Sequence, residues 1–192
     1  MIVLLLGLIL FLGIHSARIV AEPARQRFIA ARGANAWKGL YTVVSIVGFG
    51  LLVWGYGLAR AQPVLVWVPP TGTRHLAALL MLVSLVLLAA AYVPRNPIKA
   101  RLHHPMVLGV KVWALAHLLA NGLLHEVVVF GAFLLWAVLS FRAARQRDDA
   151  AGTVYPSGTL AAGAVTVVAG VVAWGVFAFG LHVWLFGVRP FG

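Results

Sequence analysis

Histidines are the residues of this chain most able to do chemistry, since there are seven of them against only four Asp or Glu residues and no cysteine. An imidazole can bind a metal, carry a proton or form a hydrogen bond between helices. Without thiolates, cysteine zinc sites, iron–sulfur clusters and covalent haem attachment are excluded. The chain also lacks the P-loop, H-E-x-x-H and G-x-S-x-G signatures. Any bound metal must therefore use histidine, methionine or carboxylate ligands.

Two of the histidines are expected at the same membrane depth on different helices. His15 lies near the end of one apolar segment, and His104 lies at the start of another. Two such imidazoles can bind one haem iron from both faces within a helix bundle. Plainer roles fit equally well: His15 as an interfacial residue bonded to the backbone, and His104, which precedes Pro105, as a helix cap. The pattern alone leaves these alternatives open.

Two further candidates follow His104 in the same apolar segment. Lys111 comes seven residues later, which puts it on the same helix face about 10 Å deeper. It either extends back to the interface or neutralises a carboxylate, such as a haem propionate or a polar substrate group. His117 shares a face with Trp113 and Asn121. An interhelical hydrogen bond accounts for His117 adequately, and cofactor binding or proton transfer is the alternative.

The elements that carry these residues are predicted from hydropathy. The composition is 62% hydrophobic and only 10% charged, so water cannot be the main solvent of this chain. We therefore expect an all-α fold, a polytopic transmembrane helix bundle that forms a single domain over residues 1–192. Its predicted spans, about six in number, are residues 1–20, 39–59, 75–94, 105–120, 126–141 and 159–188.

The positions of the basic residues predict how the bundle is oriented. Eleven of the fifteen Lys and Arg residues lie in or beside the segments 21–38, 95–104 and 142–157. By the positive-inside rule these segments are cytoplasmic, so both termini are predicted outside. No basic residue precedes the first apolar run, which favours a retained helix over a cleaved signal. The net charge of +11 is therefore explained by membrane orientation, and we expect lipid rather than nucleic acid as the partner.

Small residues predict close contacts and breaks within this bundle. The second span carries Gly48, Gly50, Gly55 and Gly57, which allow helix backbones to approach closely. The pair Asn121-Gly122 is expected to end the fourth span in a tight turn.

Three blocks of sequence also indicate a family. They are His15-Ser16-Ala17-Arg18, Trp37-Lys38-Gly39-Leu40-Tyr41, and the stretch from His104-Pro105 to Asn121-Gly122. With these blocks the chain resembles the NnrU family of bacterial membrane proteins along essentially its full length. That family is more distantly similar to the zeta-carotene isomerase of plastids, a membrane enzyme that isomerises a cis double bond and depends on a haem b held by histidines.

The resemblance implies that His15 and His104 bind haem b, and the residue pattern adds Lys111 and His117 as candidates to contact the cofactor. It also implies redox-linked chemistry or isomerisation of a lipid-soluble substrate in the bacterial inner membrane. The family name associates NnrU with nitrite and nitric oxide metabolism in denitrifiers. The alternative function is therefore a non-catalytic accessory or permease-like protein, whose histidines form interhelical hydrogen bonds without a cofactor.

Overall fold

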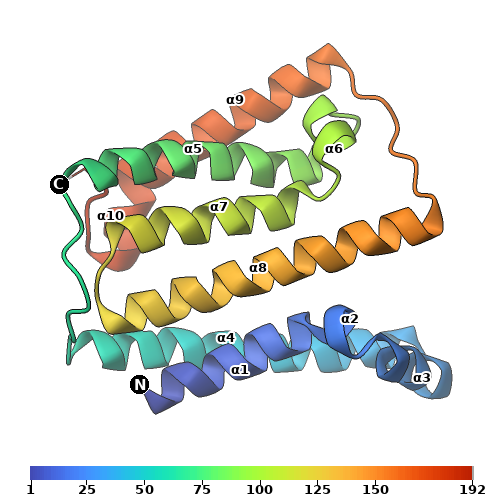
Figure 1. Cartoon of the computed structure of the whole chain (residues 1–192), viewed down its shortest axis with the longest axis horizontal. Helices are drawn as coiled ribbons and strands as arrows, with labels where there is room; N and C mark the ends of the chain where they lie inside the picture. The colour runs from blue at the N-terminus through green and yellow to red at the C-terminus, as the bar shows by residue number, and fades with distance from the viewer. Residues whose placement is uncertain (192) are drawn as a thin grey trace. The chain divides into compact units, whose positions relative to one another are not determined.

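Helices account for nearly all the regular structure of the chain. The computed structural model describes residues 1–191 (Figure 1). In that part of the chain there is no β-strand beyond an isolated antiparallel bridge between Leu65 and Leu123. The all-α prediction is confirmed. The helical elements are α1 (Ile2–His15), α2 (Ala17–Val20), α3 (Glu22–Arg32), α4 (Ala34–Arg60), α5 (Gly72–Tyr92), α6 (Pro97–Leu102), α7 (Pro105–Ala120), α8 (Leu124–Ala151), α9 (Leu160–Val176), the π-helical turn η1 (Phe177–Leu181) and α10 (His182–Phe186).

Four helical stretches are long and apolar enough to cross a membrane. They are α4, α5, α8 and the continuous stretch Leu160–Phe186, which have 27, 21, 28 and 27 residues. A transmembrane helix needs about 20 residues, so the chain is an integral membrane protein. Helices α1 and α7 are also apolar but have only 14 and 16 residues. Their lengths of about 21 and 24 Å are short of a full crossing. For these two helices, membrane spanning stays a prediction.

Two segment boundaries differ from the sequence-based expectation. The fifth span is predicted to end at residue 141, but helix α8 continues without a break to Ala151. Residues 142–151 are mostly Ala, Arg, Gln and Asp with no Gly or Pro, so nothing in the sequence breaks the helix there. The expected loop 21–38 contains α3, in which Pro23 occupies the first turn and Glu22 accepts hydrogen bonds from Arg25 and Gln26.

The helices group into two compact units. Helix α8 contributes its first residues to the first unit and its remainder to the second. The first unit comprises Met1–Val66 and Leu123–Ala132, and the second comprises Trp67–Gly122 and the chain from Phe133 onward.

In the first unit, α1 and α4 run antiparallel and pack backbone to backbone (Figure 1). A Cβ atom added to Gly48 or Gly55 of α4 would meet the backbone of α1, and one added to Gly7 of α1 would meet the backbone of α4. By contrast, a Cβ on Gly50 or Gly57 would have nothing within 4 Å. Of the four glycines for which close helix packing was predicted, Gly48 and Gly55 confirm it.

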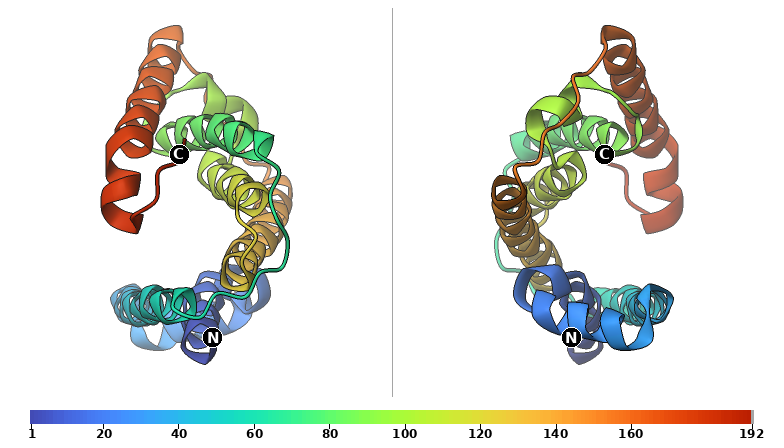
Figure 2. Two further views of the ribbon diagram at one scale, coloured as in Figure 1. Left: turned by 90° about the vertical axis from the view of Figure 1, so that its left-hand side faces the viewer. Right: turned by 90° about the vertical axis from the view of Figure 1, so that its right-hand side faces the viewer.

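In the second unit, α5 packs against both α7 and α9 (Figures 1 and 2). The Ser84 hydroxyl of α5 donates a buried hydrogen bond of 2.8 Å to the Gly109 carbonyl of α7. On the α9 side, a Cβ on Gly170 would lie 2.5 Å from the Val86 Cα. Small residues and interhelical hydrogen bonds therefore bring three helices together in this unit.

The turn between α5 and α6 is held by one buried side chain. Asn96 is only 1% exposed. Its Nδ2 donates to the carbonyls of Ala90 and Val93 at 2.9 and 2.5 Å, and its Oδ1 accepts from the Lys99 amide at 2.8 Å. The backbone amide of Thr159 donates to the Arg95 carbonyl at 2.9 Å. This turn thereby positions the segment that leads into α7 and the start of α9.

The turn after α7 agrees with the sequence-based expectation. Helix α7 ends at Ala120, directly before Asn121 and Gly122. Trp67 holds this turn, because its Nε1 donates to the Asn121 carbonyl at 3.1 Å and its amide donates to the Gly122 carbonyl at 3.2 Å. The connection between α4 and α5 is therefore attached to the end of α7.

Candidate functional site

A strained turn presents two adjacent histidines at the start of α7. His103 has φ 69° and ψ −57°. The His104 amide donates to the Leu102 carbonyl at 2.9 Å, two residues back. These angles and this bond define a classic γ-turn, which is rare and strained. Such a backbone persists only where its surroundings hold it, and strain of this kind is concentrated at functional sites.

The side chains around this turn form a polar cluster, called here the γ-turn cluster, of His103, His104, Arg145, Asp148 and Tyr155. The His103 ring stacks on Tyr155 with centroids 4.2 Å apart and planes within 5°. Arg145 forms a hydrogen bond with Nδ1 of His103. The Tyr155 hydroxyl donates to Oδ2 of Asp148 at 2.7 Å. The same oxygen lies 2.8 Å from Nε2 of His104, close enough for an ion pair but without hydrogen-bond alignment.

The hydrogen bonds of this cluster indicate where its protons lie. A guanidinium only donates, so Nδ1 of His103 accepts and its proton is on Nε2. Burial, the hydrogen bond to Asp148 and the charge of that carboxylate together raise the pKa of Tyr155 to about 12. Tyr155 is therefore a neutral donor at physiological pH, and Asp148 is the acceptor.

His104 occupies the N-cap position of α7, but its side chain makes no capping hydrogen bond. The alternative in which His104 is a helix cap therefore agrees with its position but not with a capping role of its side chain. The physical reason is that Nε2 is directed at Asp148, near the end of α8. A carboxylate beside one ring nitrogen of a histidine is an arrangement that often orients a metal-binding imidazole.

His15 closes α1 and is bonded to its own helix. Its Nδ1 lies 2.6 Å from the Phe11 carbonyl. Its ring also contacts the rings of Phe11 and Tyr41, with centroids 4.3 and 5.0 Å away. Because a carbonyl can only accept, Nδ1 carries the proton and Nε2 carries the lone pair. The backbone bond expected of an interfacial histidine is present.

Lys111 and His117 both lie half-buried on α7. Nδ1 of His117 lies 2.9 Å from the Trp113 carbonyl, and the His117 carbonyl accepts from Nδ2 of Asn121 at 2.9 Å. The shared face predicted for Trp113, His117 and Asn121 is therefore confirmed. The hydrogen bond of the His117 ring described here lies within α7 rather than between helices. It again puts the proton on Nδ1 and the lone pair on Nε2.

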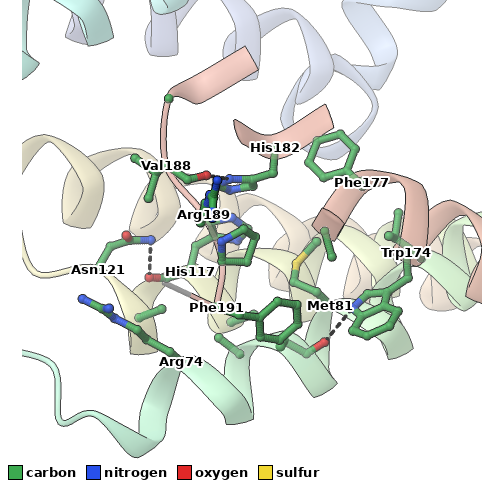
Figure 3. A pocket seen from close by; sticks show the side chains of 18 residues that line it. Arg74, Met81, His117, Asn121, Trp174, Phe177, His182, Val188, Arg189 and Phe191 are labelled. Carbon is green, nitrogen blue, oxygen red and sulfur yellow. Dashed lines mark hydrogen bonds between the residues drawn. The ribbon is translucent and has the colours of Figure 1, made fainter. Parts of the chain in front are cut away.

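His117 also lines a cavity of about 430 Å³ in the second unit (Figure 3). Helices α5 and α7, the stretch from α9 to α10 and the chain after α10 form its walls. Nδ1 of His182 lies 2.7 Å from the Val188 carbonyl, so this second imidazole has the same proton arrangement as His117. The polar residues that line the cavity are Arg74, His117, Asn121, His182 and Arg189.

The predicted set of site residues is divided between the units. His15 belongs to the first unit, whereas His104, Lys111 and His117 belong to the second. The pairing of His15 with His104 stays a prediction. Within residues 1–191, no three His, Cys, Asp or Glu side chains come together as a metal site.

Sequence reasoning missed the partners of both sites. Asp148 and Tyr155 reach His104 only because α8 continues beyond residue 141. The adjacent His103-His104 pair and the charged stretch 142–149 were the available signals. For the cavity, the signal was that Arg74, His182 and Arg189 are all expected towards the outer side of the membrane.

The fold and these sites define an all-helical integral membrane protein with polar histidine-containing sites between its helices. Its family follows from comparison: the sequence model of the family described as NnrU protein matches residues 3–190. The chain belongs to the NnrU family, as its three sequence blocks indicated. No curated protein and no solved structure matches it.

Proposed function

We propose that this NnrU family protein binds haem b through His15 and His104 in the bacterial inner membrane. In this proposal, the bound haem serves redox-linked chemistry or isomerisation of a lipid-soluble substrate. Helices α1 and α7 cross the membrane together with the four longer stretches, and both termini lie outside. The basic side chains near the end of α8 and in α3 support this orientation, because they cluster between apolar helices.

The observation that carries the proposal is the hydrogen-bonding state of His15. The Phe11 carbonyl accepts the proton of its Nδ1 at 2.6 Å, so the lone pair of the ring is on Nε2, the nitrogen that would bind iron. A metal-binding histidine commonly donates its other ring nitrogen to such an acceptor, which fixes the ring orientation and raises ligand basicity. His104 has a comparable neighbour in Asp148. Imidazole nitrogens of this kind are ordinary ligands of haem iron, so the chemistry of His15 and His104 would suit this cofactor.

The other residues of the γ-turn cluster have positioning roles in this proposal. Tyr155 holds the Asp148 carboxylate through a 2.7 Å hydrogen bond, and Asp148 orients the imidazole of His104. Lys111 supplies a positive charge for a haem propionate, and His117 is a further residue near the cofactor. When bound, haem would supply a redox-active iron, which no side chain of this cysteine-free chain can replace.

Absorption spectra of the protein purified with added haemin test the proposal. We expect a Soret band in the wild type, and its loss or a change of ligation in His15→Ala and in His104→Ala. His75→Ala is the matched control, because His75 is exposed near the start of α5 and should leave the spectrum unchanged. Helical circular dichroism of each variant separates loss of ligand from loss of fold. A wild type without a Soret band, or two ligand variants with unchanged spectra, would reject haem binding.

A deletion strain separates the proposed chemistry from an accessory role. Altered isomers of carotenoids or of another lipophilic polyene would support chemistry on a lipid-soluble substrate. A defect confined to nitrite or nitric oxide reduction, in a protein without haem, would instead identify a non-catalytic accessory.

A further inference from the structure

The cavity in the second unit is divided into a polar side and an apolar side (Figure 3). Figure 3 shows Asn121 and Arg74 at the left, Arg189 and His117 near the centre, and Trp174, Phe177 and Met81 towards the right. The apolar residues that line the cavity include Met81, Leu85, Trp174, Phe177 and Phe191. A cavity of about 430 Å³ lies in the lower part of the range of small-molecule sites. Its two-sided lining matches a ligand that is itself amphipathic.

The charge of the lining determines which kind of polar head fits. Arg74 and Arg189 both line the cavity, and its 18 lining residues include no Asp or Glu. Guanidinium groups bind carboxylate and phosphate oxygens through paired, charge-assisted hydrogen bonds. These interactions are stronger beside apolar walls than in water, because the local dielectric constant is low. The lining therefore favours an anionic head group.

The end of the chain builds this site by an irregular path. The π-helical turn Phe177–Leu181 interrupts the stretch from α9 to α10, and π-turns of this kind are frequent at functional sites. Gly187 has φ 70°, a left-handed conformation that favours glycine, and it turns the chain back after α10. Phe191 then packs against Trp174 and Phe179, with ring centroids 6.1 and 5.5 Å apart. The returning segment thereby completes the apolar wall.

From the charge, the apolar wall and the volume, we propose that this cavity binds a single-chain lipid with an anionic head, of the fatty acid class. The head group contacts Arg74 and Arg189, and the chain lies along Met81, Leu85 and Trp174. One chain, rather than the two chains of a phospholipid, suits a cavity of about 430 Å³. Neither haem nor His15 enters this inference, so it stands or falls separately from the proposed function.

Quenching of tryptophan fluorescence by a bromine-labelled fatty acid tests the proposal in the detergent-solubilised full chain. Trp174 lines the cavity, so we expect saturable quenching in the wild type and loss of that saturable component in Trp174→Phe. Arg189→Gln and Arg74→Gln should each weaken binding by about ten-fold, the size of a lost charge-assisted hydrogen bond. Arg101→Gln is the matched control, because Arg101 lies on α6 and does not line the cavity. It should bind like the wild type.

Two further ligands distinguish the sources of an anionic head. A bromine-labelled alcohol of the same chain length should give no saturable quenching, since it lacks the charge. A bromine-labelled phospholipid should fail to compete with the acid. Equal binding of the alcohol, competition by the phospholipid, or arginine variants that bind like Arg101→Gln would each overturn the proposal. The Trp174→Phe variant should still bind the acid although it has lost the fluorescent reporter. Native mass spectrometry of this variant should therefore detect one bound acid.

Discussion

In the first unit, α1 and α4 pack through glycines, whose lack of a side chain lets the two backbones touch. In the second unit, α5 also contacts its neighbouring helices through polar groups. Ser84 bonds to α7, Trp174 of α9 donates to the Ala78 carbonyl at 3.0 Å, and Asn96 holds the turn after α5. Lipid offers little hydrophobic driving force between helices, so both solutions use packing or hydrogen bonds. The glycine contact of the first unit joins two backbones directly, whereas the second unit contains the cavity and the γ-turn cluster.

The largest expected effect comes from filling the glycine contact of the first unit. Gly55→Ala should lower the free energy of unfolding by about 3 kcal/mol, because the added Cβ meets the Leu4 backbone and neither backbone can yield locally. Gly57→Ala is the matched control two residues away, where a Cβ has nothing within 4 Å. It should raise stability slightly through helix propensity. Thermal unfolding in detergent measures both. Equal effects of the two substitutions would contradict the glycine contact.

Removal of the buried amide in the second unit should have the next largest effect. Asn96→Ala should cost about 2 kcal/mol, since it leaves the Lys99 amide and the carbonyls of Ala90 and Val93 without their partner. The matched control is Asn35→Ala, at an exposed position near the start of α4. The control should change stability by less than about 0.5 kcal/mol. Chemical unfolding curves that coincide for the two variants would show that the polar turn is not what holds this unit.

A smaller loss is expected from the γ-turn cluster. Tyr155→Phe keeps the ring that stacks on His103 but removes the hydroxyl that donates to Asp148 at 2.7 Å. Because this cluster is partly exposed, the loss should be smaller than that of Asn96→Ala. Tyr92→Phe serves as the control, since Tyr92 is 77% exposed. The melting temperatures of the two variants test this prediction. A Tyr155→Phe protein as stable as the control would show that the hydroxyl does not stabilise the fold.

The smallest expected effect is a dependence on alkaline pH. Burial and Asp148 raise the pKa of Tyr155 to about 12 in the folded chain, above its ordinary value of about 10. A folded-state pKa above the unfolded value means that the contribution of Tyr155 to stability is complete below about pH 10 and is lost as pH rises towards about 12. The phenolate absorbance of the wild type minus that of Tyr155→Phe should titrate in this range. A difference titration centred at about pH 10 would contradict the burial of this hydroxyl.

Local properties of the sequence predicted the helices well. Apolar length indicated every long helix, and Pro105 with Asn121-Gly122 predicted the bounds of α7. Hydropathy did not predict that α8 continues to Ala151, because a helix can extend through charged residues where no Gly or Pro stops it. The histidines show the same difference between what local sequence predicts and what packing determines. Their presence in apolar segments marked them as functional candidates, but the contact of His104 with Asp148 depends on a segment distant in the chain.

Composition and the order of residues thus establish an all-helical membrane protein of the NnrU family, because hydropathy, helix breakers and sequence blocks are properties of short stretches of chain. Packing determines that Gly55 rather than Gly57 faces α1, that His104 meets Asp148, and that Arg74 and Arg189 share one cavity. These contacts depend on the orientation of each helix about its own axis and on which segments of the chain pack beside it. No local pattern specifies that, because the pairs Gly48/Gly55 and Gly50/Gly57 have the same seven-residue spacing although they lie on different faces of α4.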